Sequence, residues 1–88
     1  MKISHKNPWQ KTNPDDPATE LQLIGKTIKE LRFNFGLLTQ KELAEQCNVH
    51  YNTVQAIERG DRNYNLKSLL KIIRYFDYDL TTFSKELL

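Results

Sequence analysis

Residues 39–60, TQKELAEQCNVHYNTVQAIERG, predict two short helices joined by a tight turn. Thr39 and Glu42 form the T-x-x-E pattern of a capping box, in which each side chain accepts a hydrogen bond from the other residue's backbone. The first helix is therefore expected to start at Gln40. Asn48 is expected to end it, because asparagine, after glycine, best tolerates the positive φ of a sharp helix end.

The second helix of this stretch is expected over residues 51–59. Val49 lies in the turn before it, where an apolar side chain can fill the gap between the two helices. His50 takes the N-cap position, although it caps a helix less well than Ser or Asp. Two helices joined in this way form a helix-turn-helix, whose second helix lies in the major groove of DNA.

The two sides of the second helix differ in chemistry. At about 100° per residue, the branched residues Val54 and Ile57 gather on one side, which must face the core. The opposite side carries amides, a phenol and one alanine, whereas an ordinary solvated face would more often carry Glu and Lys. Asn and Gln can pair with adenine through two hydrogen bonds, and Ala can contact a thymine methyl group. The residues expected to read DNA bases are Tyr51, Asn52, Gln55 and Ala56.

The motif resembles that of the XRE family, the lambda-repressor-like and Cro-like helix-turn-helix proteins. Their common pattern is TQ-x-x-LA, a turn, and V-S-x-x-T-(I/V)-x-x-(I/L)-E-x-G. The matching residues are Thr39-Gln40, Leu43-Ala44, Val49, Thr53-Val54 and Ile57-Glu58-Arg59-Gly60. The resemblance covers about residues 20–84 and departs from the pattern at Asn48 and His50, where Gly and Ser are usual. It implies an all-α, five-helix lambda-repressor-like domain with the helix-turn-helix at its second and third helices.

The resemblance also implies contacts to the DNA backbone. In the family, the residue that matches Gln40 binds a phosphate and braces the recognition helix, and helix N-termini attract phosphates through their free N–H groups. The loop after the recognition helix follows the backbone, and an Arg there can enter the minor groove. The residues expected to bind phosphates are Gln40, Arg59, Arg62, Asn63 and Lys67. The alternative for each is a solvated surface residue.

Arg32 and Glu58 are expected to form a structural ion pair. Glu58 lies on the inward edge of the recognition helix, and family members pair an Arg late in the first helix with this Glu. A buried carboxylate without a partner would be costly, whereas a paired one fixes the helix in place. We therefore predict that this pair braces the recognition helix.

The sequence before the motif predicts one longer helix. Asp16 and Pro17 read as an N-cap followed by proline at the first helical position. An apolar stripe of helical period then runs to about Phe35, with Gly36 ending the helix. Its members are Leu21, Ile24, Ile28, Leu31 and Phe35. Residues 1–15 lack this period and are expected to form an extended or flexible tail.

The sequence after the motif predicts two further helices and no strand. Asn65 can cap the first of them and Asp79 the second. Their inward residues are expected to be Leu66, Leu69, Leu70, Ile73 and Phe76, followed by Leu80, Phe83 and Leu87. Residues 16–88 are thus expected to form one helix-turn-helix DNA-binding domain.

Composition narrows the possible functions. The chain has 88 residues, which indicates one domain, and 39% of them are hydrophobic and 27% charged, which indicates a globular one. Its net charge of only +2 does not by itself indicate nucleic-acid binding. No apolar run is long enough to cross a membrane, and a cytoplasmic location is expected. Cys47 is the only cysteine and reads as a small buried residue. Metal-ligand clusters and catalytic constellations are missing from the sequence, so we expect neither enzymatic activity nor a cofactor.

The leading interpretation is a transcriptional regulator that binds double-stranded DNA, most simply a repressor that reads a pseudo-palindromic operator as a homodimer. Dimerisation roughly doubles the contact that one short helix makes. The last helix and the terminal Leu87 and Leu88 offer apolar surface for self-association, to which Ile72, Tyr75 and Tyr78 can add.

Two alternatives remain from the sequence. The antitoxin of a toxin–antitoxin pair would also bind DNA and would use the tail around Trp9 to hold its toxin. A protein-bridging module would use the same fold to recruit partners without reading DNA, although the polar composition of residues 51–59 argues against it. The tail is basic before Asp15, so it could instead wrap around DNA.

Overall fold

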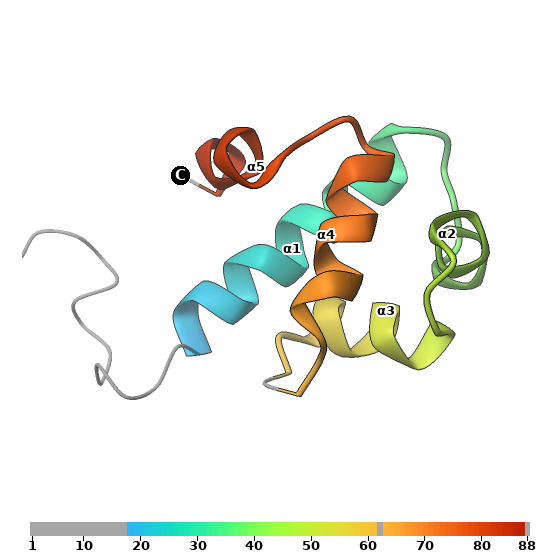
Figure 1. Ribbon diagram of the computed structural model, residues 1–88, viewed down its shortest axis with the longest axis horizontal. Helices are drawn as coiled ribbons and strands as arrows, with labels where there is room; N and C mark the ends of the chain where they lie inside the picture. The colour runs from blue at the N-terminus through green and yellow to red at the C-terminus, as the bar shows by residue number, and fades with distance from the viewer. Residues whose placement is uncertain (1–17, 62, 88) are drawn as a thin grey trace, which may run out of the picture.

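The computed structural model describes residues 18–61 and 63–87, which form five α-helices without a strand (Figure 1). The helices are α1 (Ala18–Asn34), α2 (Gln40–Cys47), α3 (Tyr51–Arg59), α4 (Leu66–Tyr75) and α5 (Leu80–Glu86). The predicted all-α, five-helix architecture is confirmed. The tail predicted for residues 1–15 and the helix start predicted at Asp16 and Pro17 lie outside the described residues. Within these ranges, no helix combines the length and apolar character that a membrane crossing requires.

Local sequence signals set the ends of the shorter helices. The Thr39 hydroxyl accepts a hydrogen bond from the Glu42 N–H at 3.1 Å, and the Glu42 carboxylate accepts one from the Thr39 N–H at 2.8 Å. Asn48 ends α2 in the left-handed conformation, with a φ of 56°. The side chains of Asn65 and Asp79 cap α4 and α5. The predicted caps are confirmed, and they satisfy backbone groups that helix ends leave without partners.

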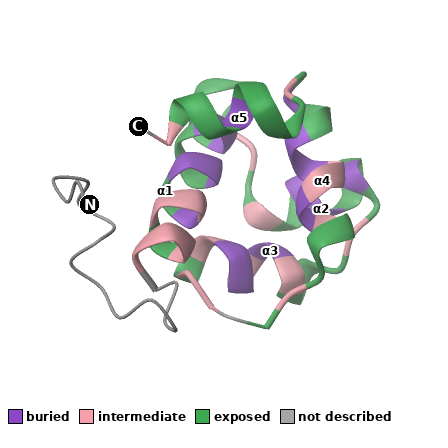
Figure 2. Cartoon of the chain, turned by 60° about the vertical axis from the view of Figure 1, so that its left-hand side comes forward, coloured by how far each residue is buried: buried purple, intermediate pink, exposed green. Residues whose placement is uncertain are grey.

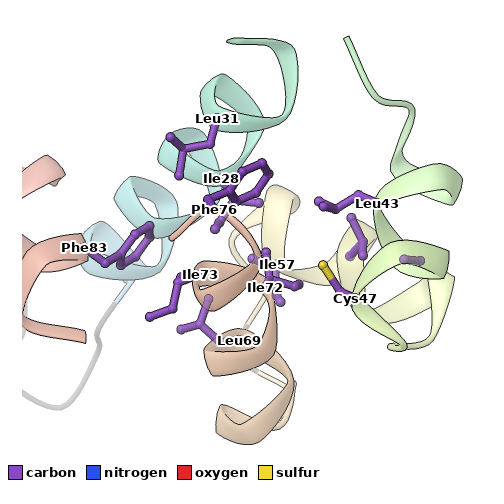
Figure 3. Packing of buried hydrophobic residues seen from close by; sticks show 12 residues of the cluster. Ile28, Leu31, Leu43, Cys47, Ile57, Leu69, Ile72, Ile73, Phe76 and Phe83 are labelled. Atoms are coloured by element: carbon purple, nitrogen blue, oxygen red, sulfur yellow. The ribbon is translucent and has the colours of Figure 1, made fainter. Parts of the chain in front are cut away.

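One hydrophobic core joins all five helices (Figure 3). Ile28 of α1, Leu43 of α2, Ile57 of α3, Ile73 of α4 and Phe83 of α5 are each almost fully buried in it. Buried positions of α1, α3 and α4 face the interior, whereas most of α5 is exposed (Figure 2). Full burial of such a side chain contributes roughly 1.5–3 kcal/mol. Because α3 supplies part of this shared core, its orientation is fixed by the fold as a whole.

Two further core residues test the sequence predictions in opposite ways. Cys47 is buried as predicted, and burial raises the pKa of its thiol to about 11, so the thiol stays protonated at neutral pH. Ile72 was expected to lie outside the core and to assist self-association, and this is wrong because it is fully buried. α4 packs between α2 and α5, so its buried side is wide enough to include Ile72 beside Ile73.

Three residues predicted to face inward are exposed. Phe35 follows the last residue of α1, and Leu66 and Leu80 are the first residues of α4 and α5. Helical period gives the direction in which a side chain points, but a residue at the end of a helix extends past the neighbour that would cover it. The Phe35 ring still contacts Phe76, with ring centroids 5.5 Å apart. The core is therefore shorter along α1, α4 and α5 than their apolar stripes suggest.

Candidate nucleic-acid interface

The middle of α1 crosses α3 at very close range. Gly25 is buried there, and a Cβ atom at this position would lie 2.8 Å from the Glu58 carbonyl oxygen and closer still to that of Ile57. Glycine in a helix interior is destabilising relative to alanine, so its presence here reflects the close contact between the two backbones. The sequence around Gly25 does not mark it as special, because no local pattern shows which helix crosses it.

The predicted brace between Arg32 and Glu58 is present. Arg32 Nε donates to Glu58 Oε2 at 2.8 Å, and a second guanidinium nitrogen donates to Oε1 at 2.9 Å. The side chains are only 8% and 4% exposed. Gln40 Nε2 also donates to Glu58 Oε1, at 3.0 Å. Three charge-assisted hydrogen bonds thus hold one buried carboxylate, and two of them form the paired arrangement that arginine favours.

The same guanidinium also fixes the loop between α1 and α2. Arg32 Nη1 donates to the Leu38 carbonyl oxygen at 2.7 Å. One arginine side chain thereby connects α1, the following loop and α3, while Gln40 links α2 to the same carboxylate. Gln40 thus makes the contact through which the family resemblance implies that it braces the recognition helix. α2 and α3 are consequently held as one unit, which fixes the direction in which the outer side of α3 faces.

The turn between α2 and α3 is supported from α4. Lys71 Nζ donates to the Asn48 carbonyl oxygen at 3.2 Å. This carbonyl lies just past the end of α2, where a cation is favoured by the helix dipole. Val49 packs against the core from inside the turn, and His50 precedes α3 without a side-chain capping bond. The turn before α3 is therefore held by contacts of Asn48 and Val49 rather than by a side-chain cap from His50.

The outer side of α3 carries three of the four expected base-reading residues. Tyr51 is 41% exposed, Asn52 is exposed and Gln55 is half-buried. Ala56 was expected to join them, and this is wrong because only 8% of its surface is exposed. α3 packs against both α1 and α2, so its buried arc extends beyond the side defined by the branched residues, and a methyl group is too short to reach out of it.

The expected phosphate-binding residues lie near both ends of the helix-turn-helix. Arg59 is exposed at the end of α3, and Asn63 and Lys67 are exposed in and just after the following loop. Arg62 lies outside the described residues. Arg59 donates to the Asp61 carboxylate at 2.6 Å, a contact that the sequence analysis missed. This hydrogen bond raises the pKa of the Arg59 guanidinium and lowers that of the Asp61 carboxyl, so both groups remain charged at neutral pH.

Comparison with known proteins agrees with this geometry. A family model described as Helix-turn-helix matches residues 36–83. This chain is 34% identical to the control protein C.BamHI of Bacillus amyloliquefaciens over 50 residues, which are 57% of its length. It is 42% identical to an uncharacterized HTH-type transcriptional regulator of Archaeoglobus fulgidus, also over 50 residues. These matches cover 62% and 69% of the two relatives.

Solved structures of similar fold include two mutants of the restriction-modification controller protein C.Esp1396I. Both are 31% identical to this chain and cover 76% of it, with TM-scores of 0.65 and 0.64. The aligned part makes up 84% and 88% of the two structures. The sequence match spans the motif, and the structural match spans most of the domain, so the chain belongs to the XRE-type helix-turn-helix family.

Proposed function

We propose that this protein is a DNA-binding transcriptional regulator whose α3 reads base edges in the major groove. The observation that carries the proposal is the outer side of α3, which presents Tyr51, Asn52 and Gln55. On its inner side, Glu58 fixes the same helix to α1 through Arg32. A phenol and two amides offer the donors and acceptors that base edges require. The named relatives, a control protein and a transcriptional regulator, support this role.

Backbone contacts in this proposal come from the flanks of the reading helix. Phosphate contacts fix register and orientation but do not read sequence. We assign them to the side chains already predicted, which are Gln40, Arg59, Arg62, Asn63 and Lys67. Gln40 keeps an amide hydrogen beyond the one used on Glu58, so it can brace α3 and contact a phosphate together. With a net charge of only +2, binding depends on where these groups lie rather than on overall charge.

A homodimer on a pseudo-palindromic operator, acting as a repressor, is the simplest form of this function. A single nine-residue helix reaches only a few base pairs, so two copies are needed for a selective site. Exposed Tyr75 and Leu80 near the junction of α4 and α5 offer apolar surface for the second copy. Ile72 is removed from that surface by its burial. The tail on which the antitoxin alternative depends lies outside the described residues.

Replacing a base-reading residue by alanine should change DNA binding in a different way from replacing a phosphate-binding residue. Asn52→Ala or Gln55→Ala is expected to weaken binding to a selected operator by about 1–3 kcal/mol and to relax preference at one position per half-site. Arg59→Ala should weaken operator and random DNA alike and lower the salt slope by about one phosphate contact. The measurement is titration of each variant against operator and scrambled duplex at several salt concentrations.

Lys85→Ala on α5 is the control for Arg59→Ala, since it removes the same charge from an exposed helix remote from α3. It should leave binding nearly unchanged. Full operator affinity and unaltered preference in both amide variants would show that α3 is not the reader. If the wild-type chain binds no DNA even at low salt, the protein-bridging function takes its place.

Asp61 should act against DNA binding. Its carboxylate competes with a phosphate for Arg59 and places a negative charge beside the backbone-binding loop. Asp61→Asn is therefore expected to tighten binding to operator and random DNA by roughly threefold at low salt, with the gain shrinking as salt rises. Asp77→Asn, an exposed acid at the end of α4, is the matched control. Weaker binding by Asp61→Asn would mean instead that the carboxylate holds Arg59 in its binding position.

A further inference from the structure

Two of the proposed base-reading side chains form a hydrogen bond with each other. Tyr51 and Gln55 lie four residues apart on α3, a spacing that makes side chains neighbours on a helix surface. Gln55 Nε2 donates a hydrogen bond to the Tyr51 hydroxyl oxygen at 3.1 Å. Gln55 is only half-exposed although it lies on the outer side, whereas Asn52 is exposed and makes no side-chain hydrogen bond within the described residues. The Gln55 amide is therefore held in one orientation by a hydrogen bond, whereas the Asn52 amide is not.

The bond determines which polar groups Gln55 presents to DNA. An amide nitrogen carries two hydrogens, and the bond to Tyr51 uses one of them. One N–H donor and the Oε1 acceptor of the amide remain. Adenine offers the complementary pair in the major groove, the N7 acceptor and the N6 amino donor, whereas guanine offers two acceptors, N7 and O6. In this orientation, Gln55 matches adenine.

The reversed amide would have the opposite effect. It would turn Oε1 toward Tyr51, whose hydroxyl hydrogen would then be used inside the protein, and it would present two N–H donors that match guanine. In the observed orientation, the Tyr51 hydroxyl accepts from Gln55 and keeps its own hydrogen for an acceptor on DNA. Base edges present several acceptors in the major groove, so the observed orientation leaves the Tyr51 hydroxyl free to donate to one of them.

We infer that Tyr51 is a positioning residue that locks the orientation of the Gln55 amide and makes the contacted position select adenine over guanine. This inference rests on the proposed function and deepens it. Holding the amide before binding also removes part of the rotamer entropy that a free glutamine would lose on contact. Asn52, for which residues 18–61 and 63–87 supply no such partner, serves as an internal comparison on the same helix.

The test uses Tyr51→Phe, which deletes only the hydroxyl group from an exposed side chain. Operators carrying each of the four base pairs at every position are titrated with the full chain and with the Tyr51→Phe, Gln55→Ala and Asn52→Ala variants. At the position that Gln55→Ala affects, the wild-type chain should prefer adenine to guanine by about tenfold or more, and Tyr51→Phe by no more than about threefold. The position that Asn52→Ala affects should keep its preference in Tyr51→Phe.

Tyr75→Phe is the matched control, since it removes an equally exposed hydroxyl from α4 and should change no base preference. A second measurement needs no DNA: in the nuclear magnetic resonance spectrum of the free protein, Tyr51→Phe should shift the Gln55 side-chain NH₂ signals but not those of Asn52. Unshifted Gln55 signals, or full adenine preference in Tyr51→Phe, would overturn the inference alone. A wild-type chain without any base preference would overturn the proposed function as well.

Discussion

A Gly25→Ala variant is expected to melt at least about 10 °C below the wild-type chain, although alanine is the better helix former by about 1 kcal/mol. The added methyl group would meet the carbonyl oxygens of Ile57 and Glu58, which are backbone atoms and cannot rotate away. Inserting a group into such a contact costs roughly 1–3 kcal/mol and occasionally more. Here α1 and α3 would have to separate, so we place the net loss at about 2–3 kcal/mol.

The sign of this effect is the decisive part, because helix propensity alone predicts stabilisation. Lys29→Ala, at an exposed position one turn further along α1, should change the melting temperature little and controls for propensity. Thermal unfolding followed by circular dichroism measures both variants. A Gly25→Ala chain that melts at or above the wild-type temperature would mean that α1 and α3 do not cross in close contact at this residue.

Replacing Arg32 by methionine is expected to cost about 3–5 kcal/mol of folding stability. The apolar part of the side chain is largely kept, so the loss reports the charge and its hydrogen bonds. Glu58 would retain only the bond from Gln40 for a carboxylate that is 4% exposed. Chemical denaturation of the wild type and the variant gives the difference, and a midpoint unchanged from the wild type would contradict the burial of this carboxylate.

A double variant separates two costs, that of leaving the buried Glu58 carboxylate unpaired and that of losing the ion pair itself. Arg32→Met combined with Glu58→Leu removes both charges, and apolar replacement of a buried ion pair is often neutral or stabilising. The double variant should therefore be more stable than Arg32→Met alone. It should also bind DNA less well than its stability suggests, because the link that fixes α3 to α1 and to the Leu38 carbonyl is gone. Equal stability of the two variants would mean that Arg32→Met loses stability through altered packing and not through the unpaired carboxylate.

The helix ends could be predicted because their causes are local. The capping box at Thr39, the left-handed Asn48 and the caps at Asn65 and Asp79 each depend on residues within one turn of the chain. The pair between Arg32 and Glu58 spans 26 positions, and it was predicted only through the resemblance to a family. Long-range contacts of this kind leave no periodic pattern in the sequence.

The remaining features depend on how the helices cross. Gly25 has its role because α3 passes over it, and Ala56 is buried because α3 has neighbours on two sides. The bond between Tyr51 and Gln55 is local, and their spacing of four residues could have indicated it. Their common side was predicted, but the direct hydrogen bond between the two side chains was not.

The bonds that hold α3 from behind and the side chains on its outer side have no residue in common. Glu58 holds the helix, whereas Tyr51 and Asn52 are exposed and Gln55 is half-buried, and none of the three belongs to the hydrophobic core. Under the proposed function, the residues that select the DNA target are therefore distinct from those that stabilise the fold. If α3 reads DNA as proposed, one copy of a duplicated gene can change its operator through these three positions and still encode a folded protein, and a protein engineer can follow the same route.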